Sequence, residues 1–280
     1  MNNFISRTVT GIFIVIFVLG GFWLHPYSFL LTGLVLVCGT QYEYYRMIRN
    51  NGVNPQMPAG LVMGVVIYSV SSLVASGTLT NEWFLLLIPV TASVMIIELY
   101  RKQERPFDSL AHTFFSVLYS AVPFSIFPFS AFSHSGLESI LNHEGIWFSP
   151  GIVVGFFLLL WANDTGAYII GISFGKHRLM ERISPKKSWE GFFGGLIIAA
   201  IAAWFLSGWL GVVSRAGWII ISLIISLAGT YGDLIESMLK RSLGVKDSGS
   251  IMPGHGGFLD RFDSVILSFP LVYLYIALFG

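Results

Sequence analysis

The residues best suited to chemistry in this sequence are concentrated between Gly232 and Ser264. This stretch holds five of the fifteen acidic residues and four of the sixteen basic residues. It lies between two apolar segments that are long enough to cross a bilayer. A charged side chain at membrane depth costs roughly 2.5–3.5 kcal/mol on insertion scales, so such a concentration of charge indicates a functional site.

Polar residues recur at helical spacing at the start of this stretch. Asp233 and Lys240 are separated by two turns, and Glu236 or Ser237 lies between them. Residues at this spacing share one face of a helix. We expect a polar stripe at the cytoplasmic end of that helix, with a merely solvated face as the alternative.

A glycine-rich loop follows. Its backbone amides at Gly254, Gly256 and Gly257 could converge on an anion, because glycine allows the required conformations. His255 fits either a phosphate contact or a structural role in the loop. The sequence therefore predicts a loop able to contact phosphate.

Asp260 and Asp263 open the last apolar segment at a spacing of three. Both carboxylates would lie on one helix face and repel each other unless a cation lies between them. Oxygen ligands beside glycine backbone and basic residues suit Mg²⁺ bound together with phosphates. A zinc site is disfavoured, because the chain has one cysteine and no close pair of histidines.

Two more polar sites lie upstream, one inside an apolar segment and one in the loop before the next. Asp164 lies inside an apolar segment, where a carboxylate needs a strong partner; a structural hydrogen bond to a neighbouring helix is the alternative. Lys187 and Ser188 precede Gly191, which opens the next apolar segment. Helix N-termini bind anions through their free N–H groups.

Composition fixes the fold class. The chain is 54% hydrophobic and 11% charged, whereas soluble domains carry about 25% charged residues. We expect an all-α, polytopic integral membrane protein with about nine transmembrane helices, each near the roughly 20 residues that a bilayer requires. The expected spans are residues 8–24, 27–41, 58–77, 83–97, 110–132, 146–172, 191–210, 218–235 and 264–279.

The basic residues orient these spans. All but one of the sixteen lysines and arginines fall on one side of the predicted membrane, the exception being Arg215. This asymmetry places the N-terminus in the cytoplasm. We expect residues 1–145 to form five N-terminal membrane helices. Residues 146–280 would form a catalytic membrane region with cytoplasmic loops at 173–190 and 236–263.

Several motifs resemble those of one enzyme family. The pattern S-x-x-K-R-x-x-x-x-K-D-x-G-x-x-x-P-G-H-G-G-x-x-D-R-x-D is met from Ser237 through Asp263. The motifs W-x-x-D-T-G-A-Y, F-G-K-H and S-P-x-K-S-W-x-G occur at 161–168, 174–177 and 184–191. Together they resemble the phosphatidate cytidylyltransferase, or CDP-diacylglycerol synthase, family. The resemblance covers roughly the second half of the chain.

The resemblance implies a nucleotidyltransferase of phospholipid biosynthesis. It would transfer CMP from CTP to phosphatidic acid and form CDP-diacylglycerol and pyrophosphate. One or more Mg²⁺ ions would act as cofactor, with a second cation allowed. The partners would be CTP and phosphatidic acid in the bilayer, with no nucleic acid. Small residues in the spans would permit a homodimer. We expect a multi-pass protein of the inner (plasma) membrane with its active site facing the cytoplasm.

The motifs, together with Asp233 on the helix before the long pattern, carry the predicted site residues. The predicted catalytic residues are Asp164, Asp233, Lys246, Asp247, Asp260, Arg261 and Asp263. Four of these would hold the metal: Asp164, Asp233, Asp260 and Asp263. The substrate-phosphate contacts would be Lys176, Ser184, Lys187, Ser188, Lys240, Arg241, His255, Gly256 and Gly257.

Alternatives come from other classes. An ion-coupled transporter would also use buried carboxylates, but it predicts polar residues spread across mid-depth rather than gathered at cytoplasmic ends. Another lipid-phosphate enzyme, such as a polyprenol kinase, fits the membrane class. A CDP-alcohol phosphatidyltransferase is disfavoured, because its D-G-x-x-A-R pattern does not occur.

Overall fold

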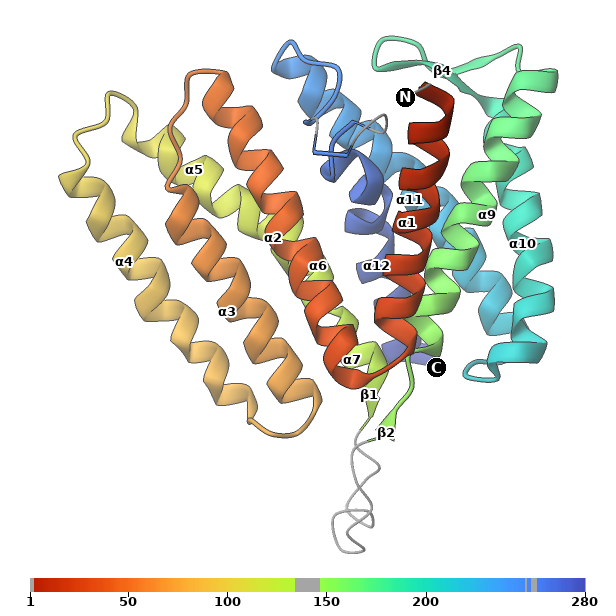
Figure 1. Ribbon diagram of the computed structural model, residues 1–280, viewed down its shortest axis with the longest axis horizontal. Helices are drawn as coiled ribbons and strands as arrows, with labels where there is room; N and C mark the ends of the chain where they lie inside the picture. Colours follow the sequence, from red (N-terminus) through yellow and green to blue (C-terminus); the bar gives the residue numbers. More distant parts are fainter. Residues whose placement is uncertain (1–2, 134–146, 250, 253–255, 280) are drawn as a thin grey trace, which may run out of the picture. The chain divides into compact units, whose positions relative to one another are not determined.

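The computed structural model describes residues 3–133, 147–249, 251–252 and 256–279 (Figure 1). Within these residues the chain is helical apart from two small antiparallel strand pairs and the connecting loops. The predicted all-α class is therefore confirmed.

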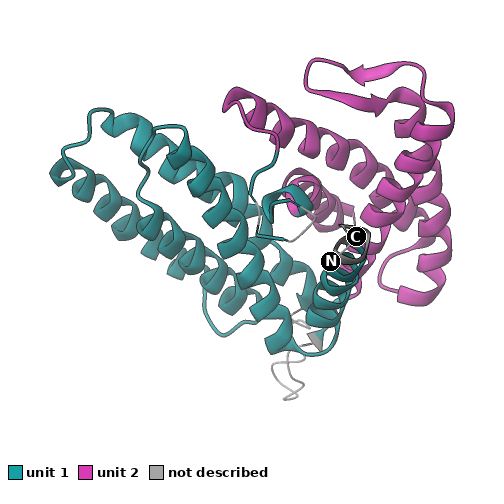
Figure 2. Cartoon of the chain, turned by 45° about the horizontal axis from the view of Figure 1, so that its top comes forward, with its two compact units in different colours: residues 1–150, 247–261 teal, residues 151–246, 262–280 magenta. Residues whose placement is uncertain are grey.

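The chain forms two compact units (Figure 2). The first comprises residues 1–150 and 247–261, and the second comprises residues 151–246 and 262–280. The glycine-rich loop thus belongs with the N-terminal helices, although its flanking segments in the sequence belong to the second unit. The predicted division into N-terminal and catalytic membrane regions at residue 145 stays a prediction.

The described part of the first unit is mainly helical, with one pair of short strands. Its elements are α1 (Asn3–Trp23), α2 (Pro26–Asn50), α3 (Met57–Ala75), η1 (Asn81–Leu86), α4 (Leu87–Tyr100), α5 (Pro106–Ser116), the π-helical η2 (Val117–Ala121), α6 (Val122–Ser125), α7 (Phe127–Ala131), β1 (Phe132–Ser133) and β2 (Trp147–Phe148). Strands β1 and β2 pair antiparallel.

The start of helix α2 is defined by Pro26 and by the capping residue before it. Pro26 occupies the first turn, where a missing N–H removes no helical hydrogen bond. The residue before it, His25, caps the helix: its ring Nδ1 accepts a hydrogen bond from Tyr27 N at 3.2 Å, and its own N–H donates to Ser28 Oγ at 3.1 Å. This reciprocal capping fixes the start of the helix that carries Glu43.

The second unit contains four helices and a β-hairpin. Its elements are α9 (Gly151–Phe174), β3 (Arg178–Met180), β4 (Ser184–Ser188), α10 (Trp189–Leu210), α11 (Arg215–Ser242) and most of α12 (Leu259–Phe279). The hairpin β3–β4 lies in residues 173–190, which the sequence predicted only as a cytoplasmic loop.

Helices α9 and α10 pack closely because small residues line their interface. A Cβ atom on Gly166 would lie 3.1 Å from the Cα of Gly195, and one on Gly191 would lie 3.1 Å from the Cα of Gly171. Such backbone approach between membrane helices requires glycine or another small residue. This packing holds the start of α10, and with it the end of β4, against α9.

Seven helical segments of the described chain are long and apolar enough to cross a membrane. They are Met57–Ala75, Asn81–Tyr100, Pro106–Ala131, Gly151–Phe174, Trp189–Leu210, Arg215–Ser242 and Leu259–Phe279. The first two predicted spans fall on α1, whose apolar part covers Thr8–Trp23, and on α2. The chain is a multi-pass membrane protein, while the count of nine spans and the cytoplasmic N-terminus stay predictions.

Candidate active site

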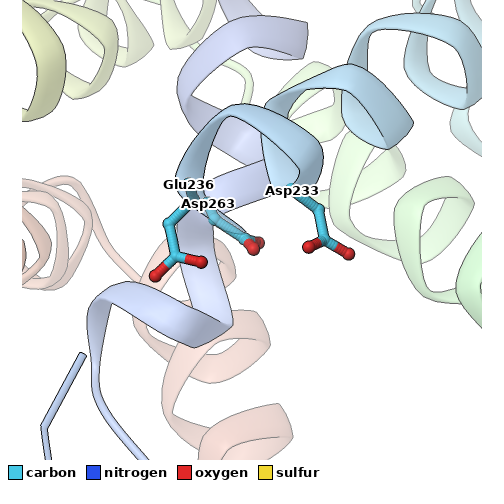
Figure 3. A group of neighbouring side chains, drawn as sticks. All are labelled: Asp233, Glu236 and Asp263. Atoms are coloured by element: carbon cyan, nitrogen blue, oxygen red, sulfur yellow. The ribbon is translucent and has the colours of Figure 1, made fainter. Parts of the chain in front are cut away.

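Three carboxylates meet where α11 lies against α12 (Figure 3). Asp233 and Glu236 come from α11 and Asp263 from α12, and one oxygen of each lies within 4.8 Å of the others. Glu236 is 0% exposed and Asp263 is 8% exposed, whereas Asp233 is half-buried. Asp263 Oδ1 also accepts a hydrogen bond from Ser264 N at 2.6 Å. Three carboxylates at this distance, two of them buried, repel one another unless cations compensate them.

Close helix packing brings the three together. Asp233 and Glu236 are three residues apart, so they share one face of α11. Gly232 precedes them, and a Cβ atom there would lie 2.9 Å from the carbonyl oxygen of Asp263. The absence of a side chain at Gly232 thus lets the backbone of α12 come near enough for Asp263 to join the pair.

Two lysines provide part of the compensation. Lys187 Nζ lies 2.5 Å from Asp233 Oδ2, and Lys240 Nζ forms an ion pair with Glu236 Oε2 one turn along α11. Ser237 Oγ donates to Asp233 Oδ1 at 3.2 Å. With all groups ionised, three carboxylates and two ammonium groups leave one formal negative charge. We call Asp233, Glu236, Asp263, Lys187 and Lys240 the acid–lysine cluster.

The β3–β4 hairpin carries Lys187 to this cluster. Lys187 is the penultimate residue of β4, and the strand register pairs Ser188 with Arg178. Ser188 then caps α10, because its Oγ accepts a hydrogen bond from Gly191 N at 3.1 Å. Ser188 is buried, so the hydroxyl predicted to contact phosphate has a structural partner in the helix cap.

Glu190 fixes the turn after α9. Its carboxylate accepts hydrogen bonds from the backbone N–H groups of Lys176 and His177 at 3.1 and 3.2 Å. It also lies 2.6 Å from Nδ1 of His177. The F-G-K-H motif is thereby tied to the first turn of α10, and the side chain of Lys176 is exposed.

Asp260 occupies a different environment from Asp263. In the first unit its carboxylate accepts hydrogen bonds from Ser248 N at 3.0 Å and from Gly257 N at 2.8 Å. The amide of Gly257, predicted to contact phosphate, therefore donates to Asp260. Gly256 has a φ of 83°, a conformation that favours glycine.

The other predicted residues are placed as follows. Asp164 is exposed on α9, and its Oδ1 lies 3.4 Å from Nδ2 of Asn163. Ser184 is half-buried on β4. His255 lies outside the described residues. The remaining predicted side chains are exposed: Arg241, Lys246, Asp247 and Arg261.

Sequence reasoning left two acidic residues of this region out of the predicted site. Glu236 stands at helical spacing between Asp233 and Lys240, so the spacing itself was the signal that could have selected it. Glu190 stands between Trp189 and Gly191 in the W-x-G motif, at the start of a predicted span. An acidic residue in the first turn of a helix is a common position for backbone contacts.

The structure defines a polytopic membrane protein with a part-buried acid–lysine cluster, which suits an enzyme acting on anionic groups. Residues 5–279 match the model of the cytidylyltransferase family. The chain therefore belongs to this family.

Individual relatives share the same name. A phosphatidate cytidylyltransferase of Staphylococcus haemolyticus is 34% identical over 277 residues, which cover 95% of this chain and 96% of that protein. One of Synechocystis sp. is 32% identical over 266 residues, covering 88% and 86%. One of Bacillus subtilis is 46% identical over 124 residues, 44% of this chain and 46% of that protein. The likeness thus extends to the N-terminal half, where the sequence motifs gave no resemblance.

Proposed function

We propose that the chain is a phosphatidate cytidylyltransferase that transfers CMP from CTP to phosphatidic acid. The observation that carries this proposal is the acid–lysine cluster within a chain of the cytidylyltransferase family. Its relatives of that name align over nearly the whole chain. The active site would face the cytoplasm at the plasma membrane, in keeping with the distribution of basic residues.

The reaction needs little proton transfer. A phosphate oxygen of phosphatidic acid attacks the α-phosphorus of CTP, and the bond from that phosphorus to the oxygen bridging the β-phosphorus breaks. CDP-diacylglycerol and pyrophosphate result. The attacking phosphomonoester is already anionic near neutral pH, because its second pKa is about 6. The enzyme therefore has to hold two polyanions in line rather than to provide a strong base.

The acid–lysine cluster fits a divalent cation. Carboxylate oxygens are the ligands that Mg²⁺ prefers, and three such oxygens lie within 4.8 Å of one another. We propose that Asp233, Glu236 and Asp263 hold Mg²⁺. The ion would supply electrostatic stabilisation of the charge on the transferring phosphoryl group. The assignments of Asp164 and Asp260 as further ligands stay predictions from the sequence.

The lysines would bind phosphate. Lys187 and Lys240 each face a carboxylate of the cluster, and both could exchange part of that contact for a phosphate oxygen when CTP enters. The exposed Lys176 and Arg241 would add positive charge to the same unit. Their attraction raises the local concentration of an anionic nucleotide.

The position of a radioactive label tests this proposal. Purified protein in vesicles containing phosphatidic acid is given Mg²⁺ and CTP labelled at either the α- or the γ-phosphorus. We expect the α-label to enter the lipid fraction and the γ-label to leave as pyrophosphate. Transfer of the γ-label to lipid would identify a kinase, and failure of both labels to move would contradict the proposal. A panel of the other nucleoside triphosphates tests the choice of cytosine.

A further inference from the structure

A buried glutamate in the N-terminal half contacts the glycine-rich loop. Glu43 lies on α2, is 1% exposed, and belongs to the same compact unit as residues 247–261. No motif of the sequence analysis includes it. A buried carboxylate requires hydrogen-bond donors, so its partners indicate what it does.

One oxygen of Glu43 joins the two ends of the loop. Oε2 accepts a hydrogen bond from Ser248 Oγ at 2.9 Å and a second from Leu259 N at 2.8 Å. Ser248 stands just after the K-D pair of the long motif, and Leu259 is the first residue of α12. The carboxylate thus fixes where the loop begins and where it enters the helix.

Two glycines of the loop pack directly against the carboxylate of Glu43. A Cβ atom on Gly249 would lie 2.5 Å from Oε1 of Glu43, and one on Gly257 would lie 2.5 Å from Oε2. Gly39, one turn before Glu43 on α2, leaves space for the ring of Phe258 in the same way, since a Cβ there would lie 2.7 Å from that ring. Glycines therefore occur where loop and helix touch.

Asp260 also accepts hydrogen bonds from this loop. It accepts hydrogen bonds from Ser248 N and Gly257 N, whereas Glu43 binds Ser248 through the hydroxyl. Two carboxylates thus accept hydrogen bonds from the segment between Ser248 and α12. Asp260 is close to this segment in the sequence, whereas Glu43 is far from it. The contact with Glu43 links residues 205 and 216 positions apart.

We propose that Glu43 is a positioning residue for the glycine-rich loop, holding its two ends at the spacing that catalysis requires. The inference rests on the proposed function, because the loop carries part of the motif shared with cytidylyltransferases. The proposal gives the N-terminal helices a role in the reaction, because α2 carries the carboxylate that holds the loop in position.

The test combines turnover with hydrogen–deuterium exchange of the loop in the full-length protein. Glu43→Ala removes the acceptor, so we expect kcat/KM for CTP to fall about 100-fold, as displaced reacting groups do. The loop segment around Leu259 should exchange about 10-fold faster. Glu43→Gln keeps an oxygen acceptor at the Oε2 position, so it should restore both values close to wild type.

Glu98→Ala is the matched control. Glu98 is also buried in the first unit and accepts hydrogen bonds from Gln56 Nε2 and Arg101, with no loop residue among these partners. It should lower the thermal midpoint without changing exchange in the loop or kcat/KM of the folded fraction. Equal loop exchange in Glu43→Ala and Glu98→Ala would overturn the inference.

Ser248→Ala is the second test variant, to be used where Glu43→Ala fails to fold. It removes one of the two donors and should give a smaller change of the same kind. In the Glu43→Gln background, Ser248→Ala should still speed deuterium exchange of the loop, because it removes the hydrogen bond from Ser248 Oγ. Where Glu43→Ala does fold, adding Ser248→Ala should change nothing further, because both residues act through one contact. Wild-type loop exchange in Ser248→Ala and Glu43→Gln/Ser248→Ala would contradict the role. An inactive wild-type protein would refute the proposed function alone, because exchange is measured without the reaction.

Discussion

Two regions of this molecule surround their carboxylates with different partners. In the second unit, Asp233 and Glu236 face lysine side chains and lie within 4.8 Å of Asp263. In the first unit, Glu43 and Asp260 accept hydrogen bonds from backbone amides and a serine hydroxyl. Lysine partners can be exchanged for a ligand, whereas backbone partners fix the chain. We therefore expect the carboxylates paired with lysine to bind a ligand, and the carboxylates bonded to backbone amides to hold the loop in place.

The largest effect should follow the loss of Asp263. Asp263→Asn removes one charge from the acid–lysine cluster, so CMP transfer should fall at least about 1,000-fold, because several kcal/mol of transition-state stabilisation depend on the cation. The matched control is Asp108→Asn, an exposed aspartate 3.9 Å from Arg105, which should keep wild-type turnover. Activity of Asp263→Asn at the level of the control would show that the cluster takes no part in transfer.

Lys187 should come next. Lys187→Ala leaves Asp233 without its ammonium partner and removes the proposed phosphate contact, so turnover should fall about 100-fold. The neighbouring Lys186 is exposed on the same strand, and Lys186→Ala should retain nearly full activity. Turnover of the two alanine variants would be compared at saturating CTP. Equal losses would mean that both lysines act only through the general positive charge of the loop.

Gly232 tests whether helix contact assembles the cluster. Gly232→Ala would place a methyl group 2.9 Å from the Asp263 carbonyl, so α12 must shift, at about 1–3 kcal/mol of unfolding free energy. Gly208→Ala on α10 meets no atom within 4 Å and should be neutral or slightly stabilising. Thermal unfolding in detergent compares them. A Gly232→Ala protein as stable as Gly208→Ala would disprove the close contact.

The smallest effect distinguishes the two aspartates of α12. Asp260→Asn weakens the hydrogen bonds from Ser248 N and Gly257 N, so the loop should exchange deuterium about 10-fold faster. Asp263→Asn should leave that loop unchanged despite its larger effect on turnover. Exchange measured on the same loop peptides in both variants provides the comparison. Faster exchange in both variants would show that Asp260 and Asp263 do not differ in their effect on the loop.

Local spacing predicted part of the acid–lysine cluster. The placement of Asp233 and Lys240 on one helix face follows from helical periodicity, and Glu236 lies on that face between them. The all-α membrane class follows from composition, because an apolar chain of this kind must satisfy its backbone within helices. Such features depend on neighbours in the sequence.

Contacts between distant segments could not be read in this way. The ion pair of Lys187 with Asp233 depends on a β-hairpin whose strands have few residues with strand preference. The contact of Glu43 with Ser248 depends on which helix the loop packs against, and periodicity carries no information about that choice. Asp260 and Asp263 share the spacing that suggested one joint role, yet their hydrogen-bond partners differ because the chain passes from one unit to the other between them.

The central claim is that the carboxylates of α11 and α12 hold the divalent cation used in CMP transfer. Binding of Mn²⁺, as a stand-in for Mg²⁺, is measured by electron paramagnetic resonance in wild type, Asp263→Asn and Asp108→Asn without substrates. We expect wild type and Asp108→Asn to bind the ion alike and Asp263→Asn to lose that binding. Unchanged Mn²⁺ binding in Asp263→Asn would contradict the account.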